Sequence, residues 1–523
     1  MNGWNPHAGH VVSFIDLGTN SVRMLVVRLN PNFSYTVMSQ EKEVVRLGED
    51  EFTDQTLRRE AMDRAVLVCK KFAELSRTYG ADDIIAVATS AAREATNQNV
   101  LIDRMKDEAG LDLGVISGME EARLIYLGVS SGIDLGSKTA LFIDIGGGST
   151  ELVVGGQDNY SFLDSLKLGA IRLTTMFVPE GHKGPVDDGT YNKMKRYARG
   201  LMVHTVRTVS KSSIDLTVGS SGSIMNLAEM CVRAYNGKPG ALRLSHLKKL
   251  TTMLRSLPLE ARRAVPGMNP ERADIIIGGA AVLETLMEEI KIEELTVSDR
   301  GAQNGLLVDY LSRIEGYPHA KRLSVRETSV LQLGRSCNID EHHAETVVKL
   351  ALELFDSAKA IGLHDIGRKE RELLKYAAYL HDVGDFISFT NHHAHSYYIV
   401  KNADLLGFEA KEIVMMANLV RYHRKRPPRR KDPELEDLDD RTQQKIIVLA
   451  AFMRLAETLD RSHANLVSSV ALRKSGREIV LNVEAEADVS LELWGVEGDC
   501  KAFNRAFDRD LKVEVKGPAT VMP

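Results

Sequence analysis

Two short stretches of the sequence place an aspartate, glycines and small polar residues between apolar runs. They are LFIDIGGGSTELVV at residues 141–154 and FIDLGTNSVRMLVVRL at residues 14–29, in which apolar residues lead into Asp144 and Asp16. Turns of this kind let backbone N–H groups approach an anion, while the carboxylate can hold a cation beside it. The pattern therefore predicts phosphate binding, although a glycine-rich hairpin can also be a plain turn. The turn residues that could bind phosphate are Gly18, Thr19, Asn20 and Ser21 in one stretch and Gly146, Gly147, Gly148 and Ser149 in the other.

The composition is that of a protein with several ordinary globular domains. The chain has 523 residues, of which 44% are hydrophobic and 27% charged. Its four cysteines form no CxxC pair, which indicates reduced thiols and a cytoplasmic location. Neither a signal peptide nor an apolar run long enough to span a bilayer is evident, so no membrane partner is expected. The net charge of −5 gives no general attraction to DNA, and a polyanionic ligand would need a local basic surface.

The elements around the two stretches also repeat. Each hairpin leads into a further strand, then into a helical segment such as the one predicted from Thr53 to Tyr79, and then into alternating strands and helices. This order predicts two similar α/β domains, with boundaries near Asp134 and Ile314, that face one another across a cleft where the two aspartates meet. The alternative is that the duplicated hairpins merely build two sheets.

Five motifs in order resemble the exopolyphosphatase/guanosine pentaphosphate phosphatase (Ppx/GppA) family of the actin and sugar-kinase superfamily. The motifs are DLGTNSVRM (16–24), ATSAAREATN (88–97), ISGMEEARLIYLGV (116–129), DIGGGSTEL (144–152) and VGSSGS (218–223). The resemblance implies an α/β fold with duplicated actin-like (RNase H-like, ASKHA) domains, an all-α HD-like domain and a small α/β appendage. The corresponding ranges are 1–134 for actin-like domain I, 135–314 for actin-like domain II, 315–465 for the HD-like domain and 466–523 for the appendage.

Phosphoanhydride hydrolysis needs a bound phosphoryl group, charge neutralisation and a positioned water. Asp16 and Asp144 are expected to hold Mg²⁺, with Glu151 as a further metal-linked carboxylate. The resemblance implies that Glu121, the second glutamate of GMEEA, activates the water; an acidic residue at a helix start can also serve the helix dipole alone. Further phosphate contacts are expected from residues near strand ends and helix starts, namely Arg23, Thr89, Ser90 and Arg93. Either arginine could equally be a surface residue.

One stretch departs from the family pattern. The family usually has an Arg-Glu pair between two glycines, where this chain has Gln303 and Asn304 in SDRGAQNGLL. Arg300 lies close by in the sequence. The departure weakens polyphosphate as the substrate more than it weakens phosphatase chemistry.

The sequence from about Ser324 onward is helical and rich in histidine. It resembles an HD-type domain in which His343, His381, Asp382 and Asp460 would hold a second divalent metal, and His395 and His423 could extend the set to another ion. Histidines on apolar helix faces are also common as plain core residues. The basic run RYHRKRPPRRK (421–431) is either a solvated loop or a rim that attracts phosphate.

These features together predict a cytoplasmic, Mg²⁺-dependent hydrolase that releases terminal phosphate from inorganic polyphosphate, from guanosine pentaphosphate, or from both. The resemblance also implies a homodimer. Three alternatives remain open. They are a nucleotide phosphohydrolase acting through the His–Asp site, an ATP-dependent small-molecule kinase in which Gly278 and Gly279 face an adenosine, and a non-enzymatic sensor.

Overall fold

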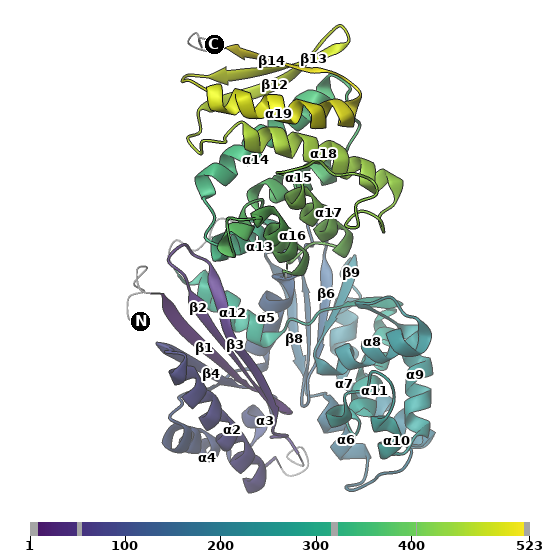
Figure 1. Cartoon of the computed structure of the whole chain (residues 1–523). Coiled ribbons are helices and arrows are strands. Elements are labelled where there is room, and N and C mark those ends of the chain that lie inside the picture. Colours follow the sequence, from purple (N-terminus) through teal and green to yellow (C-terminus); the bar gives the residue numbers. More distant parts are fainter. Residues whose placement is uncertain (1–8, 50–54, 315–322, 404, 517–523) are drawn as a thin grey trace. The chain divides into compact units, whose positions relative to one another are not determined.

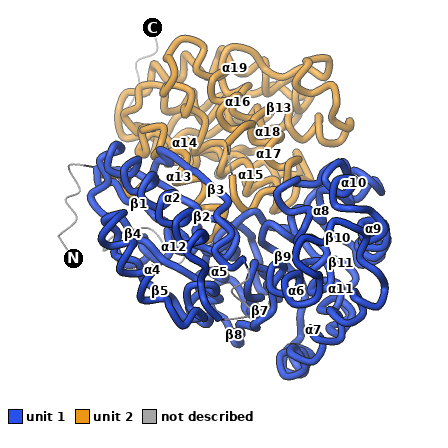
Figure 2. The backbone as a smooth tube through the Cα atoms, turned by 90° about the horizontal axis from the view of Figure 1, so that it is seen from below, with its two compact units in different colours: residues 1–31, 35–322 blue, residues 32–34, 323–523 orange. Residues whose placement is uncertain are grey.

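The computed structural model describes residues 9–49, 55–314, 323–403 and 405–516. The chain divides into two compact units (Figure 2): unit 1 comprises residues 1–31 and 35–322, and unit 2 comprises residues 32–34 and 323–523. The predicted boundary between residues 314 and 315 adjoins residues 315–322, which lie outside the described residues. No helix within the described ranges combines the length and hydrophobicity needed to cross a membrane.

Unit 1 contains two α/β halves that follow one another along the chain (Figure 1). The first half consists of β1 (His10–Leu17), β2 (Ser21–Leu29), β3 (Tyr35–Val44), α2 (Arg59–Thr78), β4 (Asp83–Ala88), α3 (Ser90–Glu94), α4 (Gln98–Arg104), the π-helix η1 (Met105–Ala109), β5 (Leu113–Val115) and α5 (Gly118–Ser130). The helix predicted from Thr53 thus begins at Arg59, and residues 50–54 are not described.

The second half begins with β6 and ends with α12. It consists of β6 (Ala140–Ile145), β7 (Thr150–Gly155), β8 (Tyr160–Leu166), α6 (Ala170–Phe177), α7 (Asp188–Val209), β9 (Leu216–Ser220), α8 (Gly222–Tyr235), β10 (Ala241–Arg243), α9 (Leu244–Ser256), α10 (Leu259–Arg263), the 3-10 helix η2 (Pro270–Arg272), α11 (Ile276–Ile290), β11 (Glu294–Val297) and α12 (Ala302–Ser312).

The two sheets have the same strand order. The first runs β3-β2-β1-β4-β5, and the second runs β8-β7-β6-β9-β11 with β10 added at its edge. In each sheet the first three strands in chain order are antiparallel neighbours. Two further strands join in parallel, β4 and β5 in the first sheet and β9 and β11 in the second. The equivalent strands β1 and β6 carry Asp16 and Asp144 near their carboxyl ends. In α/β sheets, ligands commonly bind just beyond the carboxyl ends of the strands.

Two helices are exchanged between the halves. The apolar face of α5, which follows β5, packs on the second sheet: Ile125, Tyr126 and Val129 share a core with Phe142 and Val153. Conversely, α12 follows β11 but packs against β1, where the Tyr310 and Phe14 rings meet edge to face at 5.7 Å. The helices α5 and α12 therefore lie between the two sheets (Figure 1).

Glycine allows α5 and α12 to cross with their backbones in contact. A Cβ added at Gly305 would collide with the Leu124 carbonyl of α5, and one at Gly128 would collide with the Gly301 carbonyl at the start of α12. Helix packing thus requires glycine at Gly305 in the SDRGAQNGLL stretch and at Gly128 in α5.

Unit 2 is helical with a small sheet at its C-terminal end. It consists of α13 (Val325–Ser336), α14 (Glu341–Ala360), α15 (Arg368–Tyr379), the 3-10 helix η4 (Val383–Phe386), α16 (His392–Asn402), α17 (Ala410–Arg421), α18 (Asp440–Thr458), β12 (Val467–Ser475), β13 (Glu478–Ala485), α19 (Ser490–Phe507) and β14 (Leu511–Lys516). One continuous core joins the helices to the sheet, with Leu350 and Leu354 of α14 and Leu472 and Leu481 of the strands among its members.

Local structure in unit 2 differs from the predicted pattern at one place and extends it at another. The segment LLKYAAYLHDVGDFIS reads as one helix, whereas α15 ends at Tyr379 and His381 and Asp382 lie in the turn before η4. In the C-terminal appendage, predicted only as small and α/β, the strands β12 and β13 and the helix α19 are followed by β14, which pairs in parallel with β13.

Candidate active site between the two sheets

The two aspartate–glycine hairpins form matching turns. Gly18 N–H donates to the Ser21 carbonyl at 3.0 Å, and Gly146 N–H donates to the Ser149 carbonyl at 2.9 Å. In the strand register Asp16 lies opposite Arg23, whereas Asp144 lies opposite Glu151. The duplicated turns therefore differ in charge, with an arginine in one and a carboxylate at the equivalent place in the other.

The turns line one cavity of about 120 Å³ inside unit 1. Most of the residues predicted to bind phosphate or metal line it, namely Asp16, Gly18, Thr19, Asn20, Ser21, Arg23, Thr89, Glu121, Asp144, Gly146, Gly147, Gly148 and Ser149. Residues far apart in the sequence thus meet at one site, because the equivalent strands β1 and β6 both end at this cavity.

Glu121 reaches this cavity from the first turn of α5. The helix begins after Ser117, whose hydroxyl accepts a hydrogen bond from Glu120 N–H at 3.1 Å. Glu121 is buried, and its Oε2 accepts a hydrogen bond from Arg93 Nη1 at 2.9 Å. Arg93 also donates to the Ile116 carbonyl at 3.0 Å, so its guanidinium is fixed beside Glu121.

Burial keeps the carboxylates of this cavity hard to ionise. It raises the pKa of Asp16 to about 6, with Arg23 opposing the shift and Asp144 adding to it. It raises the pKa of Glu121 to about 7, with Arg93 opposing and the carboxylates of Asp16 and Asp144 adding to the shift. The pKa values of Asp144 and Glu151 are raised for the same reason. The protein's own cations thus leave the negative charge of the site incompletely balanced.

Three of the predicted site residues do not line the cavity. Arg93 is bonded to Glu121, and Ser90 donates from its hydroxyl to Glu94 at 3.2 Å. Glu151 is buried in strand β7 of the second hairpin and accepts a hydrogen bond from the Ser165 hydroxyl at 2.8 Å. These residues surround the groups that line the cavity.

Other residues line the cavity that the site prediction did not include. Arg272, at the end of η2, is buried there, and this burial together with nearby Arg23 lowers its pKa to about 10. Ser220, at the end of β9, does not line the cavity itself but donates from its hydroxyl to Asp144 at 2.5 Å. Ser221 and Gly222 complete this wall, and the VGSSGS motif was the only sequence signal for them.

The stretch that departs from the family pattern is held by α5. Arg300 lines the cavity, but its Nε donates to the Gly128 carbonyl at 2.9 Å and its Nη2 to the Ser131 hydroxyl at 3.0 Å. Gln303 is buried, and Asn304 accepts a hydrogen bond from Gly301 N–H at 3.1 Å. Gly278 and Gly279 are buried in α11, where they pack against α6 and α8.

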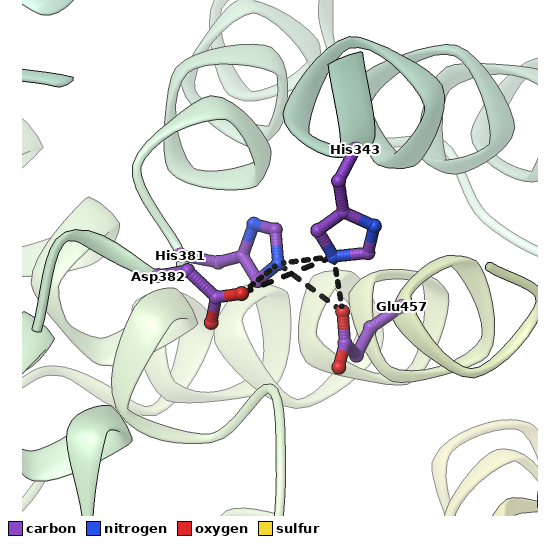
Figure 3. Close-up of side chains that lie close together, drawn as sticks. All are labelled: His343, His381, Asp382 and Glu457. Atoms are coloured by element: carbon purple, nitrogen blue, oxygen red, sulfur yellow. Dashed lines mark hydrogen bonds and ion pairs between the residues drawn. The ribbon is translucent and has the colours of Figure 1, made fainter. Parts of the chain in front are cut away.

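The His–Asp residues of unit 2 form a separate buried cluster (Figure 3). His343 comes from α14, His381 and Asp382 from the turn before η4, and Glu457 from α18. The Nε2 atoms of His343 and His381 are 3.2 Å apart, and each is 3.1 Å from Glu457 Oε2. Figure 3 shows these ligand atoms converging on one point.

Asp460 occupies a different place from the one predicted. Its Oδ2 is 2.7 Å from His343 Nδ1, on the far side of the imidazole ring from the cluster. Glu457, which was not among the predicted ligands, takes the facing position because it lies on α18, whereas Asp460 lies beyond the helix end at Thr458. Asp460 therefore orients a ligand of the cluster.

Comparisons with known proteins agree with this architecture. A sequence model of the Ppx/GppA phosphatase family matches residues 25–314, and a model of Ppx/GppA phosphatase domain III matches residues 325–497. The chain belongs to the Ppx/GppA phosphatase family. It is therefore a phosphatase, and its class is that of the hydrolases.

Relatives within the family carry more specific names. A guanosine-5'-triphosphate,3'-diphosphate pyrophosphatase of Photobacterium profundum is 27% identical over 412 residues, which cover 78% of this chain and 80% of that protein. The crystal structure of an exopolyphosphatase from Cytophaga hutchinsonii ATCC 33406 is 29% identical and covers 58% of this chain and 99% of its own, with a TM-score of 0.54. An exopolyphosphatase-like protein is 25% identical over the same share of this chain and 98% of its own, with a TM-score of 0.53.

Proposed function

We propose that this protein is a Mg²⁺-dependent hydrolase that removes the terminal phosphate from inorganic polyphosphate or from guanosine pentaphosphate. One observation carries the proposal. Two glycine-containing turns, three arginines and three acidic residues that chemistry could use, Asp16, Asp144 and Glu121, line a single cavity. The names of the relatives, one a pentaphosphate pyrophosphatase and one an exopolyphosphatase, support the two substrates.

The carboxylates of the cavity fit a magnesium ion. Asp16 Oδ1 is buried and has no hydrogen-bond partner among the described residues, so an oxygen ligand is available where a cation would restore charge balance. Asp16 and Asp144 would hold the ion directly or through water, with Glu151 behind them, since Mg²⁺ prefers carboxylate and phosphate oxygens. When bound, magnesium would neutralise charge on the phosphate oxygens.

The remaining groups divide the work of phosphoryl transfer. The N–H groups of the two turns, together with Arg23 and Arg272, would hold the terminal phosphate. Glu121 would take a proton from the attacking water, and we assign this to Oε1 because Oε2 accepts the hydrogen bond of Arg93. The bond between the terminal phosphorus and the bridging oxygen breaks, and the shortened chain leaves as an anion.

The test follows phosphate release from long-chain polyphosphate and from guanosine pentaphosphate with Mg²⁺. The variant Glu121→Gln should lower kcat by about 10²- to 10⁴-fold, the contribution of a positioned general base. The matched control is Glu120→Gln on the neighbouring residue, which pairs with Arg123 on the surface of α5 and should leave kcat unchanged. Equal activity of wild type and Glu121→Gln would refute the assignment.

The assay also separates the remaining alternatives. Membership of a phosphatase family favours hydrolysis over the kinase alternative, which predicts transfer from ATP to an acceptor. A nucleotide phosphohydrolase working through the cluster of unit 2 would lose turnover in Asp382→Ala and keep it in Glu121→Gln. The homodimer and the cytoplasmic location stay predictions.

A further inference from the structure

A second group of potential metal ligands adjoins the cluster of Figure 3. His392 at the start of α16 and His423 just after α17 face Asp382, which also belongs to the first group. The shared carboxylate presents Oδ2 to His343 and His381 and Oδ1 to His392 and His423. Four imidazoles thus surround the two oxygens of one aspartate.

Most of the distances within both groups match those of ligands around an ion, and two of them, at 3.6 and 3.9 Å, are longer. In the second group, the Nε2 atoms of His392 and His423 are 3.0 Å apart, and they lie 3.4 and 3.6 Å from Asp382 Oδ1. In the first group the corresponding distances lie between 3.1 and 3.9 Å. Two donors that are each about 2.1 Å from an ion, at angles of about 90° to 109°, stand about 3.0 to 3.4 Å apart.

Hydrogen bonds on the opposite ring nitrogens fix the orientation of all four histidines. Each Nδ1 faces an oxygen: Asp460 Oδ2 for His343, and the carbonyls of Ala378, Phe389 and Val420 for His381, His392 and His423. An Nδ1–H that donates to oxygen leaves Nε2 with a lone pair, which is the arrangement of metal-binding histidine. Two lone pairs facing each other at 3.2 or 3.0 Å repel, and a cation between them removes the conflict.

Asp382 provides an independent sign of a missing partner. Its Oδ1 is buried and has no hydrogen-bond partner among the described residues, although two imidazole nitrogens face it. A buried carboxylate oxygen without a partner is costly, and a metal ion at the second position would satisfy it.

We propose that unit 2 holds two first-row transition-metal ions bridged by Asp382, and that this dinuclear centre hydrolyses phosphate esters. One ion would be bound by His343, His381 and Glu457, and the other by His392 and His423. Mixed imidazole and carboxylate ligands suit Mn²⁺, Fe²⁺, Co²⁺ or Zn²⁺ better than Mg²⁺. The centre is distinct from the cavity of unit 1, whose ligands are all oxygens.

The charge of the loaded centre selects an anionic substrate. Two divalent ions bring four positive charges against the two negative charges of their carboxylate ligands, Asp382 and Glu457. The carboxylates of Asp460 and Asp385 lie farther out, against the Nδ1 atoms of His343 and His392, so the positive charge remains on the side of the ions.

A hollow of about 590 Å³ is lined in part by Arg424 and Lys425, which directly follow His423 in the chain, although none of the six proposed metal ligands lines it. Arg424 links the hollow to the proposed metal centre, because it lines the hollow and its Nε lies 4.0 Å from Oε1 of Glu457. Arg421 and Arg426 also line the hollow but are paired with Glu434 and Asp432.

Two ions that share a carboxylate suit the hydrolysis of a phosphate ester, because both can act on the same substrate phosphate. Bound ions would supply a water of lowered pKa; its attack on phosphorus would break the ester P–O bond, and the alcohol would leave with the proton that the water gives up. One water is consumed for each ester, with no change of oxidation state. Arg424 would hold a phosphate oxygen opposite the ions.

The first test counts tightly bound metal. The protein, carrying Asp16→Asn and Asp144→Asn to remove the cavity ligands of unit 1, is stripped with chelator, loaded with Co²⁺ and desalted, and the metal is measured by plasma mass spectrometry. We expect two ions per chain, one after His423→Ala, and loss of both after Asp382→Ala. His395→Ala is the matched control, because His395 lines the hollow outside both groups, and it should keep two. One ion or none in the parent protein would overturn the dinuclear centre whether or not the variants fold.

The second test measures hydrolysis of p-nitrophenyl phosphate and bis(p-nitrophenyl) phosphate by the same Co²⁺-loaded protein. Release of p-nitrophenol that depends on Co²⁺ and falls to the metal-free background in Asp382→Asn is the expected result. A protein that holds two ions and cleaves neither ester would overturn the catalytic part. Because the cavity of unit 1 is disabled throughout, failure here leaves the function proposed for that cavity untouched.

Discussion

Removing Arg93 should shift the pH dependence of phosphate release and leave its maximum nearly unchanged. Arg93 donates to Glu121 at 2.9 Å and opposes the rise that brings the pKa of Glu121 to about 7. A hydrogen bond to a charged group is worth about 1.5 to 3 kcal/mol, and one pKa unit corresponds to about 1.4 kcal/mol. In Arg93→Ala the pKa of Glu121 should therefore rise by about 1 to 2 units.

The sign of the effect follows from the role of a base. Glu121 must be deprotonated to accept the proton of water, so activity is lost as the pH falls through its pKa. At a pH equal to the wild-type pKa about half of the glutamates are ionised, against about 1 to 10% in the variant, which predicts a 5- to 50-fold lower rate at that pH. Bound magnesium would lower both pKa values, so the separation between the two acid limbs is the quantity to measure.

The assay is the pH profile of kcat from pH 5.5 to 9.5 with polyphosphate. Arg123→Ala is the matched control, because Arg123 forms the same kind of pair with Glu120 and Asp309 away from the cavity. A loss that is the same at every pH and is accompanied by a higher KM would refute the reasoning. Such a result would indicate instead that Arg93 binds a phosphate group of the substrate.

Three further predictions concern stability and metal binding. Gly305→Ala should destabilise unit 1 by about 1 to 3 kcal/mol because the new Cβ collides with α5. Gly200→Ala, at a helical glycine with open space around it, should instead stabilise unit 1 by about 0.5 to 1 kcal/mol. Thermal unfolding measures both changes. In the presence of a chelator, the free energy of unfolding should fall as the pH rises from about 4 to 7, because the pKa of Asp16 is about 6 in the folded state against an ordinary 3.8. Mg²⁺ at a hundredfold excess over its Kd should raise the free energy of unfolding by about 2.7 kcal/mol at pH 7. A calorimetric stability that is flat with pH and unaffected by Mg²⁺ would contradict this. Asp460→Asn should weaken Co²⁺ binding by about 10- to 100-fold while keeping two ions per chain, as isothermal titration can show, because Asp460 orients His343 without facing the ions.

Local patterns were enough to predict the hairpins and the start of α5. The alternation of apolar runs with glycine indicated the turns after Asp16 and Asp144, and GMEEA after Ser117 indicated a helix start that presents Glu121. Arg272 could not be found in this way, because it lies in a short 3-10 helix and only the folding of the second half brings it to Asp144.

Helix phase and tertiary packing account for the other differences. Asp460 has the right residue type for a metal ligand, yet the end of α18 at Thr458 turns it to the far side of His343 and leaves Glu457 facing the cluster. The sequence order places α5 with the first sheet, whereas its contacts are with the second. The glycines that permit the exchange were visible in the sequence, but only the packed helices reveal their purpose.

The exchange of α5 has a mechanical consequence for the candidate base. Glu121 travels with the second sheet, to which α5 is packed, while Arg93 travels with the first, through β4 and α3. Any hinge motion that separates the two sheets would move the Arg93 guanidinium away from the Glu121 carboxylate and raise the pKa of Glu121. The hydrogen bond between these two side chains would therefore favour the deprotonated, water-activating form of Glu121 only while the two sheets are close together.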